Sequence, residues 1–171
     1  MKQTRLILVG GFLGAGKTTL LWETAVRLMN KGLRVGLITN DQAPELVDSE
    51  LLKLSDLRVA EVSGSCFCCN FNGFTDAIKE IRAEASADVI IAEPVGSCTD
   101  LSATIMQPLK QYWNTELKIS PLTVLADPNR LVSILNGGNG GLHPDAAYIY
   151  KKQLEESDII LLSKSDVLKR E

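Results

Sequence analysis

The stretch Gly11-Phe12-Leu13-Gly14-Ala15-Gly16-Lys17-Thr18 decides the fold of this chain. It matches the pattern G-x-x-x-x-G-K-[ST] at every fixed position, and chance produces such a match in a chain of this length well under about 1% of the time. The pattern needs small residues because backbone N–H groups must curl around phosphate oxygens without a Cβ in the way. We therefore predict a phosphate-binding loop rather than a glycine-rich turn without a ligand.

The residues around this loop have distinct expected roles. Lys17 is expected to reach the β- and γ-phosphates, the Thr18 hydroxyl to bind Mg²⁺, and Thr19 to add a phosphate contact. Some related ATPases carry an extra lysine near the start of the loop, and Phe12 at that place argues against that branch. The residues expected to bind the nucleotide here are Gly11, Gly14, Ala15, Gly16, Lys17, Thr18 and Thr19.

Working outward, apolar runs typical of buried parallel strands alternate with stretches of helical period. We expect strands at residues 6–9, 34–39, 57–62, 88–92, 122–126 and 158–162, and helices at 17–30, 75–85 and part of 102–113, with a short helical pattern at 50–54. The glycine-rich loop at 136–144 must be mobile or tightly turned. This alternation predicts an α/β fold of three layers, a P-loop NTPase fold with a mostly parallel central sheet.

Composition limits the chain to one core. It has 171 residues, 45% of them hydrophobic, which suits a single P-loop domain over residues 1–171. A net charge of -3 and scattered basic residues argue against nucleic acid, and no apolar run is long enough for a membrane span. The apolar start reads better as a strand than as a signal peptide, which favours the cytoplasm and free thiols or metal ligands over disulfides. The chain stops soon after the strand expected at 158–162, where such folds usually continue, so we expect a truncated domain.

The segment Cys66-Phe67-Cys68-Cys69 concentrates three of the four cysteines. Thiolates at this spacing suit a soft or borderline ion, with Zn²⁺ the default, and we favour metal or redox work over cysteines that only pack as small hydrophobes. Three thiolates leave a tetrahedral site one ligand short. Water, Cys98, His143, Asp41 or a partner are the candidates for the fourth, although His143 alone reads better as a solvated loop residue.

Polar residues follow several of the expected strands. Glu93 lies at the end of the strand expected at 88–92, where it can serve Mg²⁺ or its waters, and Gly96 is placed to sense a γ-phosphate through its N–H. Asp127 is equally a site residue or a turn former before Pro128. Lys164 and Asp166 follow the last strand and resemble the N-K-x-D element that reads guanine, with Ser163 in place of the usual Asn.

The ordered set G-G-F-L-G-A-G-K-T-T, C-F-C-C, E-P-V-G and S-K-S-D resembles the CobW-like metallochaperone GTPases, which are related to the urease and hydrogenase nickel-insertion GTPases. The resemblance covers essentially the whole chain. It implies that Cys66, Cys68 and Cys69 bind a transition metal, usually thought to be Zn²⁺, and that nucleotide state is coupled to metal handling. It also implies that Lys164 and Asp166 read the base.

Three departures from the family pattern stand out. Asn40-Asp41 stands where the family often has Asn-Glu, Ser163 replaces Asn, and the family's usual C-terminal domain is absent from this sequence.

The leading hypothesis is a slow GTP hydrolase that uses GTP and Mg²⁺ to move or gate Zn²⁺ or another transition metal. Lys17, Glu93 and Gly96 are its expected catalytic residues, and a client metalloprotein and an oligomer are its expected partners. One alternative is a metal-binding or thiol-redox module whose nucleotide site does not drive it. Another is an ATPase or a small-molecule kinase.

Overall fold

A computed structural model of the protein describes residues 2–40 and 57–165. Its centre is a seven-stranded sheet in the order β3-β2-β4-β1-β6-β7, with β5 also paired to β1, and every pair is parallel. The predicted α/β fold with a mostly parallel sheet is confirmed. The strands are β1 (Thr4–Gly11), β2 (Val35–Asn40), β3 (Leu57–Val62), β4 (Val89–Glu93), β5 (Leu117–Ile119), β6 (Thr123–Ala126) and β7 (Ile159–Leu162).

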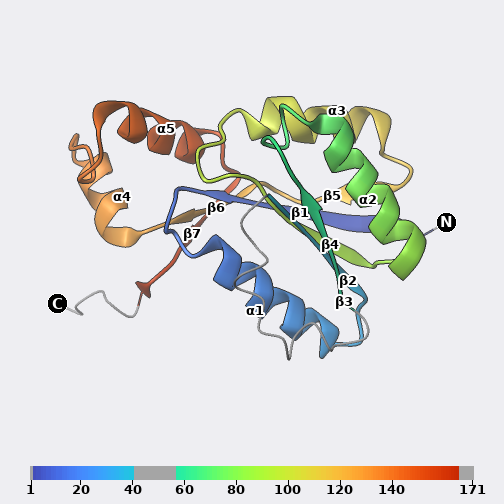
Figure 1. Ribbon diagram of the computed structural model, residues 1–171. Coiled ribbons are helices and arrows are strands. Elements are labelled where there is room, and N and C mark those ends of the chain that lie inside the picture. Colours follow the sequence, from blue (N-terminus) through green and yellow to red (C-terminus); the bar gives the residue numbers. More distant parts are fainter. Residues whose placement is uncertain (1, 41–56, 166–171) are drawn as a thin grey trace.

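Helices cover both faces of the sheet, as Figure 1 shows. Helix α1 lies on one face and α2, α3 and α5 lie on the other, so the molecule has three layers. Within residues 2–40 and 57–165, none of the helices has the length and apolarity to cross a membrane. The helices are α1 (Lys17–Met29), α2 (Phe71–Ala85), the π-helical η3 (Ser102–Met106) that continues into α3 (Gln107–Tyr112), α4 (Pro128–Leu135) and α5 (Pro144–Glu155).

Each face of the sheet has its own core. Leu21 and Ala25 of α1 pack with Ile91 of β4 on one side. Phe74 of α2 and Ile90 of β4 belong to the larger cluster on the other side. Alternate residues of β4 thus face opposite cores, which explains why this strand is a continuous apolar run in the sequence.

Several elements differ from the sequence-based expectation. Helix α2 begins at Phe71 rather than at residue 75, because the Asn70 side chain caps it by accepting a hydrogen bond from Gly73 N. Strand β5 and helices α4 and α5 were not predicted. The loop at 136–144 is tightly turned, with positive φ at Gly137, Gly140 and Gly141.

Strand β7 corrects the expectation of a buried sixth strand. Its four side chains, from Ile159 to Leu162, are each 40% to 47% exposed. The reason is its position, since β7 is an edge strand that pairs with β6 alone among the strands of the described residues. The helical pattern expected at 50–54 lies outside those residues.

The parallel sheet also determines where a site can form. In a parallel sheet all strands end at the same edge, so the loops that follow β1, β3 and β4 meet there. These loops carry the glycine-rich motif, the cysteines and the segment after Glu93 respectively.

Candidate functional site

The glycine-rich loop joins β1 to α1 and adopts a conformation that requires its glycines. Gly14 and Gly16 have φ of 74° and 93°, in the left-handed region that side chains other than glycine rarely adopt. Gly11 is needed for a different reason, because a Cβ there would lie 2.7 Å from Leu125 O of the neighbouring strand β6. Ala15 is buried against the core under α1.

A lysine, a threonine and a glutamate converge where this loop enters the helix. Lys17, which is 6% exposed, donates to Phe12 O at 3.4 Å, and its Nζ lies 3.8 Å from Glu93 Oε1. Thr18 Oγ1 donates to the same carboxylate oxygen at 3.1 Å. The predicted association of Glu93 with the phosphate loop is therefore present in three dimensions, although 75 residues separate Glu93 from Thr18.

Burial affects the ionisation of both charged members of this group. It lowers the pKa of Lys17, and the nearby Glu93 opposes the shift. It raises the pKa of Glu93, against the opposing effects of Lys17 and of the Thr18 hydrogen bond. Each charge is thus held in a poorly solvated place by the other, which suits a site whose counter-charge arrives with a ligand.

These residues line a cavity of about 760 Å³, a size within the usual range for small-molecule sites. The loop contributes Gly14, Gly16, Lys17, Thr18 and Thr19 to its wall. Gly11, Ala15 and Lys164 are not part of that wall. Residues 93–97 after β4, Thr39 and Asn40 from β2, and residues 64–66 after β3 complete it.

Gly96 packs directly against the phosphate loop. A Cβ at this position would lie 3.0 Å from Leu13 N and 3.1 Å from Lys17 Nζ, so the close approach depends on the absence of a side chain. The segment that follows Glu93 is therefore in contact with both the backbone and the lysine that a phosphate would engage.

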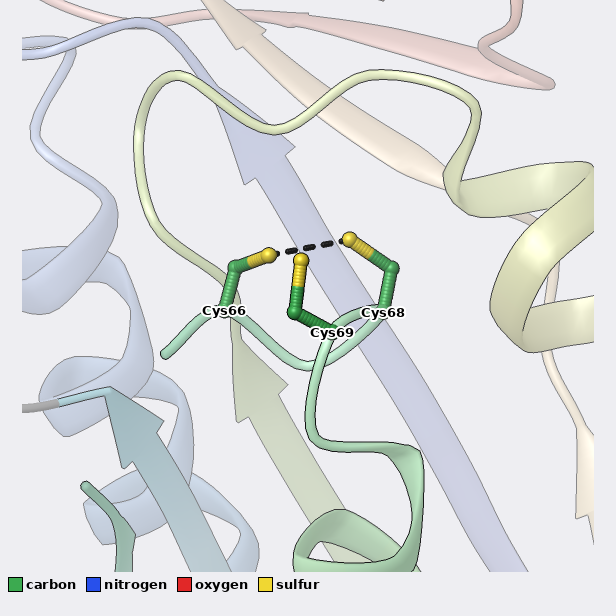
Figure 2. Close-up of side chains that lie close together, drawn as sticks. All are labelled: Cys66, Cys68 and Cys69. Carbon is green, nitrogen blue, oxygen red and sulfur yellow. Dashed lines mark hydrogen bonds between the residues drawn. The ribbon is translucent and has the colours of Figure 1, made fainter. Parts of the chain in front are cut away.

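The three predicted metal-binding cysteines form one cluster at the start of α2, shown in Figure 2. The Sγ atoms of Cys66, Cys68 and Cys69 all lie within 4.8 Å of one another, and those of Cys66 and Cys68 are 3.0 Å apart. In Figure 2 the three sulfur atoms point toward a common space. Three converging thiols fit the donor set that zinc and other borderline ions prefer.

The thiols of the cluster differ in acidity. Burial opposes ionisation of Cys66, but hydrogen bonds from Cys68 and Cys69 outweigh it and lower the pKa of Cys66 to about 7. Burial and then the neighbouring Cys66 raise the pKa of Cys68 to about 11. The cluster thus stabilises one thiolate at the expense of its neighbours, and a cation is what would allow all three to ionise.

Asn40 is a residue of this site that the sequence singled out only as a departure from a family pattern. Its Nδ2 donates to Val62 O at 2.6 Å and to Ser65 O at 2.9 Å. The end of β2 therefore holds the backbone immediately before Cys66. No local pattern marks these bonds, because the two strands involved are 22 residues apart in the chain.

The other candidate ligands have different places. His143 is exposed and caps α5 by accepting from Asp145 N, as expected of a solvated loop residue. Cys98 is buried in the cluster against which Cys66 and Cys68 pack. Asp41 lies outside the described residues.

The predicted base-reading residues follow β7. Lys164 Nζ is 3.3 Å from Asp127 Oδ2, which joins the ends of β6 and β7. Asp127 also caps α4 by accepting from Asn129 N and Arg130 N, so its role before Pro128 includes turn formation. Asp166 lies outside the described residues, and the base-reading role of Lys164 stays a prediction.

The fold and this phosphate loop define a P-loop nucleotide-binding protein. The model of the family described as CobW/HypB/UreG, nucleotide-binding domain, matches residues 5–171, and the chain belongs to this family. The family resemblance seen in the sequence motifs is thereby confirmed.

Curated relatives extend over the same region. Zinc chaperone YeiR of Escherichia coli is 25% identical over 167 residues, which cover 95% of this chain and 47% of that protein. Zinc chaperone CobW of Sinorhizobium sp is 28% identical over 187 residues, with 94% and 50% covered. The chain therefore spans about half the length of these relatives.

Solved structures share the fold. The Zn(II)-bound YjiA GTPase from E. coli has a TM-score of 0.65 at 20% identity, covering 98% of this chain and 51% of that one. Hydrogenase maturation factor HypB from Archaeoglobus fulgidus has a TM-score of 0.61 at 14% identity, with 96% and 68% covered.

Proposed function

We propose that this chain is a metal-binding GTPase domain that couples GTP binding and hydrolysis to the handling of zinc or another transition metal. The observation that carries the proposal is a shared wall. Cys66 of the cysteine cluster lines the same cavity as Lys17, Thr18, Glu93 and Gly96. A nucleotide in this cavity therefore lies next to the thiols that would hold the metal.

The names of the relatives support this assignment. YeiR and CobW are zinc chaperones, and a relative from Dictyostelium discoideum that is 24% identical is a zinc-regulated GTPase metalloprotein activator. By the same comparison, the metal is cargo for a client metalloprotein. The choice of guanine rests on the Lys164 element.

The residues of the cavity divide the work of hydrolysis. Lys17 neutralises charge that develops on the β,γ-bridge and the γ-phosphate, where a buried cation acts strongly. The Thr18 hydroxyl and the Glu93 carboxylate offer the oxygen ligands that Mg²⁺ prefers, and the ion would supply further charge neutralisation. Glu93 and Gly96 lie where an attacking water is oriented.

Turnover should be slow. Lys17 is the sole cationic side chain among the described residues of the cavity wall. An arginine that reaches the transferring phosphate accelerates related enzymes by about 10³- to 10⁵-fold. We expect a rate on the order of 10⁻³ s⁻¹ or below for the isolated chain.

The test of coupling is a pair of GTP titrations, with and without saturating Zn²⁺. Coupling between two sites is reciprocal, so zinc should change GTP affinity by the factor by which GTP changes zinc affinity. Identical GTP affinities in the two titrations would exclude coupling. Competition between GTP and ATP tests the base, and equal affinities would favour the ATPase or kinase alternative.

Replacing Lys17 tests whether the nucleotide site drives the metal site. Lys17→Ala should weaken GTP binding by about 10- to 100-fold, the value of one or two charge-assisted hydrogen bonds. Lys31→Ala, at the exposed far end of α1, is the control and should bind GTP normally. Metal transfer that is unchanged in Lys17→Ala would favour a metal or redox module with a passive nucleotide site.

A further inference from the structure

Residues 96–98 lie between the phosphate loop and the cysteine cluster. Gly96 packs against Lys17, as described above, and Cys98 follows two residues later with its side chain 7% exposed. Cys98 belongs to the buried cluster against which Cys66 and Cys68 pack. In Figure 2 the loop that follows β4 passes around the three labelled sulfur atoms.

The proximity of Cys98 to the cluster is also evident in its acidity. Burial, and after it the charges of Cys66 and Cys68, raise the pKa of Cys98 to about 12. Cys98 also interacts with Cys66 through a side-chain hydrogen bond. A thiol in such a place stays protonated until a cation replaces its proton.

The backbone of this segment is fixed from the opposite side. Gln153 of α5, which is 2% exposed, donates through Nε2 to Gly96 O at 3.0 Å and to Cys98 O at 2.9 Å. Cys98 N in turn donates to Val95 O at 3.0 Å. These bonds hold Gly96 and Cys98 together, so a displacement of one is transmitted to the other.

We propose that Cys98 is the fourth ligand of the metal held by Cys66, Cys68 and Cys69, and that it links this metal to the nucleotide. Four thiolates complete the tetrahedral shell of a structural-type zinc site. On binding, the Cys98 thiol releases its proton to solvent and its sulfur donates a lone pair to the ion. This inference rests on the proposed function, because it takes the three-cysteine cluster to be a metal site.

Cobalt substitution counts the thiolates directly, because each sulfur-to-Co²⁺ charge-transfer contact adds to the near-ultraviolet absorption. The full chain is loaded with one equivalent of Co²⁺ and compared with Cys98→Ala and Cys98→Ser. Loss of one thiolate from four should reduce the band by about one quarter. Thr99→Ala, at the next residue, is the matched control and should leave the band unchanged.

Zinc affinity gives a second measurement, taken by competition with a chelating dye. Both Cys98 variants should bind zinc at least about tenfold more weakly, since even the outer-shell partners of metal ligands are worth that much. Retained GTP binding in the absence of metal shows that a variant is folded, and Cys98→Ser serves if Cys98→Ala is not. Wild-type absorption and affinity in the folded variants would overturn the proposal, as would a wild-type band no stronger than three thiolates produce.

The two levels of the argument fail separately. A variant with alanine at Cys66, Cys68 and Cys69 should bind no Co²⁺, and binding that persists there would overturn the metal site itself. If that variant loses the metal while Cys98→Ala keeps the full band, the metal site stands and the role of Cys98 is wrong.

The link to the nucleotide has its own readout. GTP should change the cobalt band of the wild-type chain and have a smaller effect in Cys98→Ala, where the contact between the segment and the ion is broken. An equal change in both proteins would show that the coupling takes another route.

Discussion

At the scale of single residues, the site is defined by charges that burial has left with few partners. Lys17 and Glu93 lie 3.8 Å apart, and burial shifts the pKa of each toward its neutral form. A triphosphate and its metal ion provide the charges that such a pair lacks. The residues that bind substrate are therefore also the residues whose ionisation the fold disfavours.

Glu93→Gln should separate binding from hydrolysis. The amide keeps the size of the side chain and can still accept from Thr18, but it cannot orient a water or take a proton as a carboxylate does. We expect GTP affinity within a few-fold of wild type and single-turnover hydrolysis slower by about 10²- to 10⁴-fold. Glu61→Gln, exposed on β3, is the control, and unchanged hydrolysis in Glu93→Gln would remove Glu93 from the mechanism.

Gly96→Ala tests the contact between the segment after β4 and the phosphate loop. The new Cβ would lie 3.0 Å from Leu13 N, and the backbone there must move to accept it. A strained contact of this kind is worth about 1–3 kcal/mol, which corresponds to GTP binding about 5- to 100-fold weaker. Titration with a fluorescent GTP analogue measures this loss, and wild-type affinity would show that the loop adapts freely.

At the scale of elements, the metal site depends on how α2 begins. Cys69 N donates to Cys66 O at 3.0 Å, Asn70 N donates to the same carbonyl at 2.9 Å, and the Asn70 side chain then caps the helix. The turn that brings the cysteines together is thus continuous with the first turn of α2.

Asn70→Ala should weaken both the helix and the metal site. Loss of an N-cap costs about 1 kcal/mol of unfolding free energy, with a range of about 0.5–2. Urea unfolding should show this loss, and zinc affinity should fall because the cysteine turn loses its anchor. Asn70→Asp, which keeps the capping oxygen, should restore both, and a zinc affinity that is normal in Asn70→Ala would show that the turn is held by other contacts.

The same scale shows what the sequence could predict. Strands β1, β2, β3, β4 and β6 were expected because their apolar runs are continuous and local. Helices α4 and α5 had a local signal that was missed, since Asp127-Pro128 and His143-Pro144 each pair a capping residue with proline at the first helical position. The nearness of Cys98 to Cys66 had no such signal, because it depends on which strands lie side by side.

At the scale of the whole molecule, the two edges of the sheet have different tasks. The cavity and the cysteines lie where the strands end. At the opposite edge, before β4 begins, Asp88 accepts from Arg34 N at 3.0 Å and pairs with Lys2 at 2.8 Å and with Arg34 at 3.2 Å. These contacts join the segments that lead into β1, β2 and β4.

Asp88→Asn should therefore reduce stability and leave the nucleotide site intact. Hydrogen bonds and ion pairs with Arg34 and Lys2 hold the pKa of Asp88 well below its usual range. The stabilisation is thus fully present above the ordinary value near about 3.9 and is lost as pH falls from there toward the folded-state pKa.

Urea unfolding at two pH values checks this expectation. At pH 7 the variant should be less stable by about 1–3 kcal/mol, and at pH 3 the difference should be smaller. GTP affinity at pH 7 should match the wild type. An equal difference at both pH values would show that the loss is one of packing rather than of charge.

The strand order has a consequence for how the chain is made. Strand β3 precedes the cysteines, but the loop with Cys98 follows β4, and β4 must insert between β2 and β1 to bring it there. During synthesis the cysteine turn therefore leaves the ribosome before its cover exists, and parallel pairing of this kind is slow. For that interval the thiols are open to oxidants and to any passing ion, and only the finished sheet makes them selective.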